Sequence, residues 1–189
     1  MNVYDFDGTI YDGESVFDFY LYSVRKQPKL IKYLFVVVKT LVQYKLCRMP
    51  KEKLLYLAQK YAKQYLLEIE NLDGKIKDFW DRNAHKIKPY YHLQQQEDDV
   101  ILSASINCLL EEIAERLGIS HLICTCMDKE TGEVLSLCYR ETKAELFQKQ
   151  FPETEIENFY TDSFNDATMM KLAKHTYLVK GNKITLLEE

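Results

Sequence analysis

Hydrophobic and polar positions divide the first half of the chain into a short strand and a long helical stretch. The opening NVYDF is a β-branched and aromatic run with an acidic tip, and Gly8 and Thr9 follow it. This pattern predicts a strand that carries Asp5 into a turn. From residue 14 to about residue 87, apolar side chains recur at helical spacing, so we expect three or four helices and no strand there.

After Pro89 the pattern changes to short apolar runs that alternate with amphipathic stretches. The apolar runs predict strands over residues 99–103, 120–127, 156–160 and 176–179, with a possible hairpin strand over 133–139. The amphipathic stretches predict helices over residues 107–117, 142–150 and 167–174. Strands that alternate with helices indicate βαβ units and a parallel sheet. We therefore predict an α/β fold, in which a three-layer Rossmann-like core of residues 1–13 and 88–189 carries an inserted all-helical domain of residues 14–87.

Composition favours a globular protein that acts on small molecules. Of the 189 residues, 47% are hydrophobic and 29% are charged, which is unlike the composition of disordered chains. The formal net charge is -4 and no block of lysine and arginine dominates. Because nucleic acids are bound by clustered cations, we expect no nucleic-acid partner.

The cysteines and the first residues indicate a cytoplasmic protein. The five cysteines are odd in number and lack the spacing of a disulfide framework or a zinc site, and they stand at Cys47, Cys108, Cys124, Cys126 and Cys138. We interpret them as reduced thiols. The first residues show no basic stretch followed by an apolar run, so we expect no secretory signal.

One segment, residues 30–46, is apolar enough to raise the question of a membrane span. It is shorter than the roughly 20 residues that a spanning helix needs, and it contains Lys32, Lys39 and Lys45. We therefore expect a buried or surface-docked helix, and membrane association through residues 30–46 stays open.

Candidate chemistry begins with Asp5 and Asp7 in DFDGT. Two positions apart at a strand tip, they point to the same side and could serve one reaction centre, although such a pair alone is also typical of solvated turn acids. A hydroxyl residue in ILSAS, a lysine in ETKAEL and two acids in TDSFND follow downstream, namely Ser103, Lys143, Asp162 and Asp166.

These groups suit a phosphatase that uses a carboxylate nucleophile. Carboxylate and phosphate repel each other, so Mg²⁺ and Lys143 would neutralise both. Mg²⁺ takes oxygen ligands, here the Asp5 carboxylate, the Asp7 backbone carbonyl and Asp162. Ser103 and nearby backbone N–H groups can bind the phosphoryl oxygens. Asp7 would protonate the leaving oxygen and later accept a proton from the hydrolytic water. Lys129 and Lys149 are alternatives to Lys143.

The chain resembles the haloacid dehalogenase superfamily, and within it the phosphoserine-phosphatase-like branch. DFDGT matches the first family motif, Ser103 the second, Lys143 the third, and Asp162 with Asp166 the fourth. The resemblance covers the predicted core, and the helical insertion stands where that branch has its cap domain. It implies an Mg²⁺-dependent phosphatase that hydrolyses a small-molecule phosphomonoester through an aspartyl phosphate on Asp5.

The resemblance also implies a role for each site residue. The catalytic residues would be Asp5, Asp7 and Lys143; the metal-binding residues Asp5, Asp7, Asp162 and Asp166; and the substrate-binding residues Thr9, Glu14, Ser103, Ala104 and Asn165. Asp166 would act through water or by holding Lys143.

Glu14 follows Asp5 by nine residues, which in the phosphoserine-phosphatase branch is the spacing of a glutamate that meets the ammonium group of the substrate. The alternative is that Glu14 only caps the first helix of the insertion, where the helix dipole stabilises an acid. The branch also uses a cap arginine for the substrate carboxylate, and the candidates here are Arg25, Arg48 and Arg82.

Two other functions stay open at this stage. One is a phosphatase of a lipid-linked phosphate at a membrane surface, with residues 30–46 docked on the lipid. The other is a non-catalytic binding protein on the same fold.

Overall fold

A seven-stranded sheet lies at the centre of the computed structural model, which describes residues 1–46 and 49–187. The strands are β1 Asn2–Tyr4, β2 Val100–Ile106, β3 His121–Met127, β4 Val134–Ser136, β5 Ile156–Thr161, β6 Ala173–Lys180 and β7 Lys183–Leu187. Their spatial order is β4-β3-β2-β1-β5-β6-β7. The five inner strands run parallel, and β4 and β7 are antiparallel to their neighbours at the two edges.

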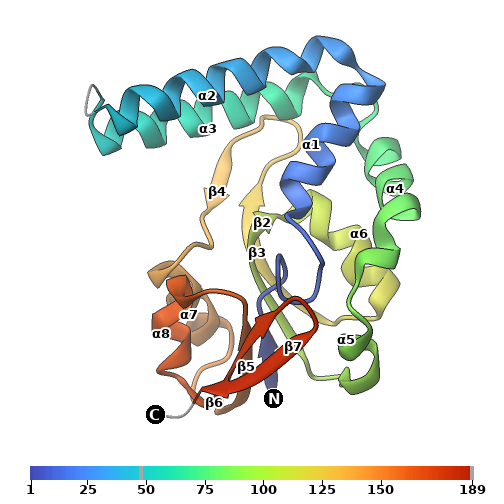
Figure 1. Cartoon of the computed structure of the whole chain (residues 1–189), viewed down its shortest axis with the longest axis vertical. Coiled ribbons are helices and arrows are strands. Elements are labelled where there is room, and N and C mark those ends of the chain that lie inside the picture. Colours follow the sequence, from blue (N-terminus) through green and yellow to red (C-terminus); the bar gives the residue numbers. More distant parts are fainter. Residues whose placement is uncertain (47–48, 188–189) are drawn as a thin grey trace.

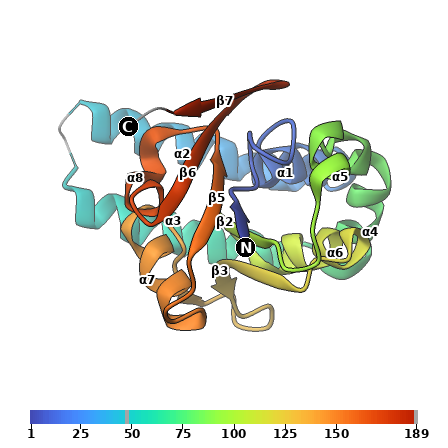
Figure 2. The same ribbon diagram turned by 90° about the horizontal axis from the view of Figure 1, so that it is seen from below.

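Helices cover both faces of this sheet. They are α1 Ser15–Lys26, α2 Lys32–Lys45, α3 Lys51–Glu68, α4 Leu72–Asn83, α5 Pro89–Gln94, α6 Asn107–Leu117, α7 Glu141–Gln150 and α8 Ala167–Met170, with short 3₁₀ turns η1 Pro28–Ile31, η2 Ala84–Lys86 and η3 Phe164–Asp166. Figure 2 shows α7 and α8 on one side of the sheet and α4, α5 and α6 on the other. The predicted α/β fold class is therefore confirmed.

The strands are buried on both faces because their successive side chains enter different hydrophobic clusters. On β1, Val3 packs in the cluster that includes Phe147 of α7, whereas Tyr4 packs in the cluster of the α6 side. On β2, Val100 packs in the cluster that includes Phe147, and Ile101 packs in the cluster of the α6 side. Such continuous burial explains why these strands are apolar runs rather than alternating patterns.

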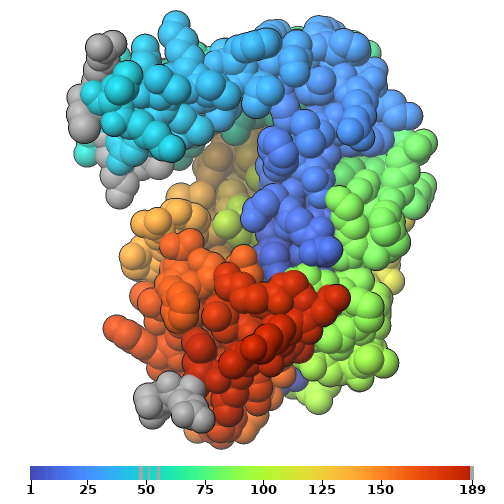
Figure 3. Space-filling model, viewed as in Figure 1, coloured from blue at the N-terminus to red at the C-terminus, as the bar shows by residue number. Residues whose placement is uncertain are grey.

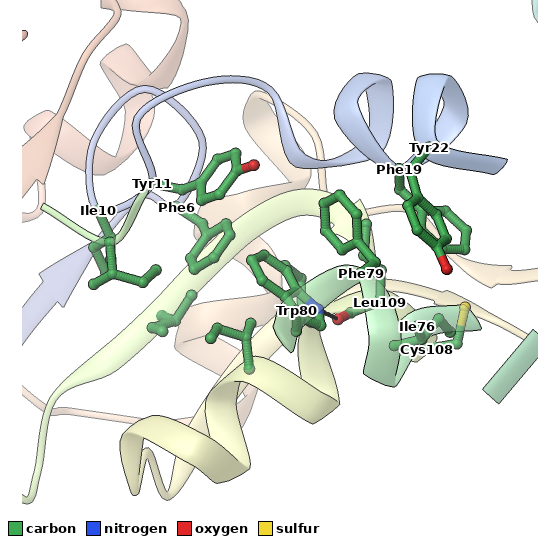
Figure 4. Close-up of a cluster of buried hydrophobic side chains, with 14 of the residues drawn as sticks. Phe6, Ile10, Tyr11, Phe19, Tyr22, Ile76, Phe79, Trp80, Cys108 and Leu109 are labelled. Carbon is green, nitrogen blue, oxygen red and sulfur yellow. Dashed lines mark hydrogen bonds between the residues drawn. The ribbon is translucent and has the colours of Figure 1, made fainter. Parts of the chain in front are cut away.

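Helix α4 packs against α6 and against the loop that follows β1 (Figure 4). The Trp80 indole donates a hydrogen bond of 2.7 Å to the Leu109 carbonyl of α6. The same indole packs edge-on against Phe6 and Tyr11, at centroid distances of 6.1 and 5.5 Å. Helix α4 therefore holds the loop that follows β1 against α6.

Helices α2 and α3 form a hairpin that extends away from the sheet (Figure 1). The surface is hollowed between this hairpin and the part of the chain beyond residue 130 (Figure 3). The described part of residues 14–87 contains four α-helices, which agrees with the predicted three or four. The division into a core of residues 1–13 and 88–189 and an inserted domain of residues 14–87 stays a prediction.

The last part of the chain differs from its predicted elements. The helix expected over residues 167–174 ends at Met170, and β6 starts at Ala173, because pairing of Ala173 with Ile156 of β5 overrides the local pattern. Strand β7 was not predicted. It is added through a tight hairpin in which Gly181 has a φ of 57°. The predicted hairpin strand over 133–139 is confirmed over three residues, Val134–Ser136.

The apolar segment of residues 30–46 contains α2, whose Phe35 and Val38 side chains are exposed while Tyr33 and Thr40 are buried. Across the described ranges, every helix is too short or too polar to cross a membrane. Contact of this segment with a membrane surface stays a prediction.

Candidate active site

A cavity of about 370 Å³ lies where the inner strands end, and it collects nearly all the predicted site residues. Asp5 follows β1 directly, Ser103 lies on β2, and Asp162 follows β5. These three strands are neighbours and run parallel, so their carboxyl ends meet at one edge of the sheet. The cavity is lined by Asp5, Asp7, Glu14, Val16, Ser103, Ala104, Ser105, Tyr139, Arg140, Lys143, Asp162, Asn165 and Asp166.

The turn after Asp5 is fixed by backbone hydrogen bonds and by one glycine. The Phe6 carbonyl accepts from the N–H groups of the third, fourth and fifth residues after it, and the Lys88 ammonium donates to the Gly8 carbonyl at 2.5 Å. Gly8 has a φ of 72°, and a Cβ added there would lie 2.7 Å from Cγ of Asp162. Glycine therefore serves two purposes, because it permits the left-handed backbone and leaves room for the Asp162 carboxylate.

Lys143 pairs with two of the predicted site acids, Asp5 and Asp166. From the first turn of α7, its Nζ donates to Asp5 Oδ1 at 2.8 Å and to Asp166 Oδ2 at 2.9 Å, and all three side chains are buried. Asp166 also accepts from the Thr161 hydroxyl at 3.2 Å. Of the alternatives, Lys129 bonds Asp73 outside the cavity, at 3.1 Å, and Lys149 does not line the cavity either. The geometry therefore favours Lys143 as the cation of the site.

The charges around Asp5 are unbalanced. Burial raises the pKa of Asp5 to about 7, although Lys143 acts against this shift. Burial also opposes the charge on Lys143, but Asp5 and Asp166 outweigh it and raise the pKa of that ammonium. Burial likewise raises the pKa of Asp162. The cavity is lined by five acids and by only two cations, Lys143 and Arg140, so a bound cation would stabilise the ionised forms of the acids.

Asp7 is held by two donors that the sequence pattern did not predict. Its Oδ1 accepts from the Ser15 backbone N–H at 2.6 Å, and its Oδ2 accepts from the Ser105 hydroxyl at 2.5 Å. Burial raises the pKa of Asp7, whereas these hydrogen bonds lower it. Ser105 stands two positions after Ser103, so strand alternation could have indicated it. The Ser15 N–H is a free donor at the start of α1 and has no signature in the sequence.

The remaining predicted residues differ in their access to the cavity. Ala104 and Asn165 are exposed and line it, and the Ser103 hydroxyl accepts from the Ser105 N–H at 3.1 Å. Thr9 is fully buried and does not line the cavity; its hydroxyl has no hydrogen-bond partner among the described residues. The structure therefore gives no support to the predicted contact between Thr9 and a substrate.

Arg140 supplies a positive charge that the sequence analysis did not assign. It lines the cavity beside Tyr139 and has a φ of 53°, which is unusual for a residue with a side chain. Strained backbone conformations of this kind are concentrated at functional sites. Arg25 and Arg82 do not line the cavity, and Arg48 lies outside the described residues, as does Cys47.

The donor atoms at this edge suit Mg²⁺. Within residues 1–46 and 49–187, no three His, Cys, Asp or Glu side chains form a ready-made metal cluster. The predicted direct ligands are only two carboxylates, Asp5 and Asp162, together with the Asp7 carbonyl, and Mg²⁺ usually keeps several waters. Asp166, the fourth predicted metal residue, was expected to act through water or by holding Lys143, and in the structure it accepts a hydrogen bond from Lys143. All of these donors are hard oxygen atoms, which Mg²⁺ prefers over nitrogen and sulfur.

Comparison with known proteins identifies the family. The model of the haloacid dehalogenase-like hydrolases matches residues 3–171, so the chain belongs to this family, and the resemblance inferred from the motifs is confirmed. Comparison with curated proteins found no match.

Solved structures share the fold at low sequence identity. A protein with unknown function from Bordetella pertussis Tohama I is 15% identical with a TM-score of 0.69, and the match covers 93% of this chain and 87% of that one. A phosphoserine phosphohydrolase-like protein from Francisella tularensis subsp. tularensis SCHU S4 is 16% identical with a TM-score of 0.55, covering 93% and 86%. A probable phosphoserine phosphatase from Vibrio cholerae is 15% identical with a TM-score of 0.62, covering 93% and 55%.

Gly8 offers a test of how the turn positions Asp162. Both Gly8 and Gly118 have left-handed backbones, with φ of 72° and 67°, but a Cβ on Gly118 would meet no atom within 4 Å. We expect Gly118→Ala to lower the free energy of unfolding by about 1–2 kcal/mol, the cost of the left-handed backbone. Gly8→Ala should cost at least about 1 kcal/mol more because it crowds Asp162. Urea denaturation measures both values, and equal losses would contradict this account.

Proposed function

We propose that this protein is an Mg²⁺-dependent phosphatase that hydrolyses a small-molecule phosphomonoester through an aspartyl phosphate on Asp5, in the cytoplasm. The observation that carries the proposal is the pair of buried ion pairs that Lys143 makes with Asp5 and Asp166. They lie at the carboxyl ends of the parallel strands, in the cavity that Asp7 and Asp162 also line. Holding a buried carboxylate beside further acids is unfavourable, because the like charges repel each other. Catalysis gives a reason for such an arrangement, whereas a non-catalytic binding protein would not need it.

The geometry supports different tasks for the two oxygens of Asp5. Oδ1 is held by Lys143, whereas Oδ2 has no hydrogen-bond partner among the described residues. The free oxygen can attack phosphorus, forming the Asp5–phosphorus bond while the bond from phosphorus to the alcohol oxygen breaks. Lys143 keeps the carboxylate oriented, and Ser103 with neighbouring backbone N–H groups binds the phosphoryl oxygens. When bound, Mg²⁺ supplies the charge that lets a carboxylate approach a phosphate.

Asp7 moves the proton in both half-reactions. Protonated Asp7 donates to the departing alcohol oxygen, and the resulting carboxylate then accepts a proton from the water that hydrolyses the aspartyl phosphate. Hydrogen bonds from Ser15 and Ser105 fix its position, and burial raises its pKa toward the range useful for proton transfer. Inorganic phosphate and free Asp5 are the products of the second step.

Glu14 is the candidate residue for substrate specificity. It occupies the N-cap position of α1, but its side chain makes no capping hydrogen bond, and it lines the cavity. This geometry favours substrate contact over the alternative that Glu14 only caps the helix. An ionised carboxylate there would favour a substrate with a positive charge a few bonds from the phosphate.

A lipid-linked phosphate at a membrane surface is the second candidate substrate class. Along one face of α2, Phe35, Val38 and Val42 are 68%, 50% and 49% exposed. Residues 32–68 contain eight Lys and Arg and two acids, although the whole chain has 25 Lys and Arg and 29 acids. An apolar and basic hairpin is suited to docking on an anionic lipid surface.

Replacing the nucleophile tests the mechanism. Asp5→Asn should lower the rate of p-nitrophenyl phosphate hydrolysis at least about 1,000-fold, because the amide cannot form the intermediate. Asp12→Asn is the matched control, since Asp12 is exposed in the same loop and does not line the cavity. Circular dichroism should show both variants folded. Near-normal turnover by Asp5→Asn would disprove the mechanism.

Metal removal tests the cofactor. Chelation with EDTA should abolish hydrolysis and excess Mg²⁺ should restore it. Asp162→Ala should weaken Mg²⁺ binding at least about tenfold by calorimetry, because it removes a charged oxygen ligand, while the exposed Asp98→Ala should not. Full activity after chelation, or unchanged Mg²⁺ affinity in Asp162→Ala, would show that the assignment is wrong.

A substrate panel tests Glu14. Phosphoserine and phosphoethanolamine should be better substrates than glycerol phosphate. Glu14→Gln should raise KM for the two amines by about tenfold or more, as expected for loss of a charged hydrogen bond, and should leave KM for glycerol phosphate nearly unchanged. Glu52→Gln, on the exposed surface of α3, is the control. An equal loss for all substrates would leave Glu14 as a structural residue.

Vesicle binding tests the membrane candidate. Wild-type protein should sediment with phosphatidylglycerol vesicles and not with phosphatidylcholine vesicles, and Phe35→Ser with Val38→Ser should reduce this binding severalfold. Leu93→Ser is the control, because Leu93 is 88% exposed but lies on α5. Absence of sedimentation with anionic vesicles would contradict the lipid-surface function.

A further inference from the structure

A second cavity, of about 500 Å³, lies among α1, α2 and α3, and its walls are mainly hydrocarbon. Helix α1 contributes Phe17, α2 contributes Val37 and Leu41, and α3 contributes Leu54 and Ala58. It is larger than the cavity that contains Asp5. A space of this size and lining is unsuited to phosphate and well suited to an apolar group.

Three of the polar side chains in these walls use their hydrogen-bonding groups elsewhere, whereas the buried Tyr65 hydroxyl has no hydrogen-bond partner among the described residues. The Tyr33 hydroxyl donates to Glu68 at 2.7 Å, and the Thr40 hydroxyl donates to the Val36 carbonyl at 2.8 Å. The Tyr20 hydroxyl accepts from the Leu34 N–H at 3.0 Å. These three groups are already paired with other parts of the chain, so what they leave facing the cavity is mainly ring and methyl surface.

The two cavities meet at the start of α1. Glu14 and Val16 line both of them. A molecule that places its phosphate at Asp5 therefore has an adjoining apolar space beyond Val16 for the rest of its structure. This continuity specifies the occupant, because a group in the apolar cavity would be joined to the phosphate in the polar one.

We propose that the apolar cavity binds the hydrocarbon chain of an amphipathic phosphomonoester whose phosphate is hydrolysed at Asp5. The inference rests on the proposed phosphatase function and names its substrate class. Each methylene that enters such a cavity contributes about 0.8 kcal/mol, which corresponds to about a fourfold gain in affinity. Affinity should therefore rise with chain length until the cavity is full.

Calorimetry with n-alkyl phosphonates, from methyl to dodecyl, tests this proposal in the presence of Mg²⁺ and below the concentrations at which the ligands aggregate. Phosphonates cannot be hydrolysed at the carbon–phosphorus bond by this chemistry, so binding is measured apart from turnover. In wild type, Kd should fall by up to about fourfold per methylene. Inorganic phosphate should raise the apparent Kd of every ligand in the series by the same factor, since all of them would place their phosphonate group in the same cavity.

Two tryptophan variants localise the effect. Ala58→Trp fills the cavity and should remove most of the gain with chain length while leaving the affinity for methyl phosphonate unchanged, which also shows that the variant is folded. Gln59→Trp is the matched control, because Gln59 is exposed on the same helix and does not line the cavity. It should retain the wild-type series.

Three results would overturn the inference: equal Kd values along the series, equal effects of the two tryptophans, or a dodecyl Kd that inorganic phosphate leaves unchanged. Hydrolysis of p-nitrophenyl phosphate by wild type tests the phosphatase function separately. Hydrolysis without a chain-length effect would contradict only the apolar cavity, and a chain-length effect without hydrolysis would contradict only the phosphatase.

Discussion

The pairing of one buried ammonium with two carboxylates is the interaction on which the site depends. Lys143 lies between Asp5 and Asp166 with bonds of 2.8 and 2.9 Å. Without it, parallel strands would bring like charges together in a place that water reaches poorly, and folding would oppose that arrangement. The two ion pairs join α7 to Asp5, directly after β1, and to Asp166 in η3, which follows β5.

Two parts of the molecule surround Asp5: the tightly packed loop after β1 and the extended α2–α3 hairpin. In the loop after β1, Phe6 and Tyr11 pack against Trp80, and Lys88 donates a hydrogen bond to the Gly8 carbonyl. The α2–α3 hairpin, by contrast, extends away from the sheet and carries the apolar cavity. This division suits the proposed phosphatase, because its chemistry needs fixed carboxylates, and the proposed hydrocarbon site lies between the hairpin and α1.

Sequence reasoning succeeded where a residue's place follows from its own strand or helix. Asp5 and Asp162 stand directly after apolar runs, and parallel strands bring such positions to one edge. Lys143 opens an amphipathic stretch and could be predicted at a helix start. Ser15 could not be found, because its backbone N–H reaches Asp7 only after α1 has docked. Arg140 was missed because its unusual backbone, with a φ of 53°, depends on the tertiary fold.

The last strands show the same limit. Residues 171–174 continue a helical pattern, yet pairing with β5 makes Ala173 the start of β6, and β7 exists only because β6 offers it an edge. The apolar cavity was also beyond prediction. Its residues read as the packed interior of a helical domain, and only the arrangement of three helices shows that space remains between them.

Chemical trapping of the intermediate is the most direct test of the account. Phosphate-labelled substrate is mixed with enzyme and Mg²⁺, the reaction is stopped with acid during turnover, and the labelled peptide is fragmented to locate the phosphoryl group. The account predicts one acid-stable, base-labile label on Asp5 and none on Asp7. Release of phosphate with no labelled protein, or with the label on another residue, would contradict covalent catalysis by Asp5.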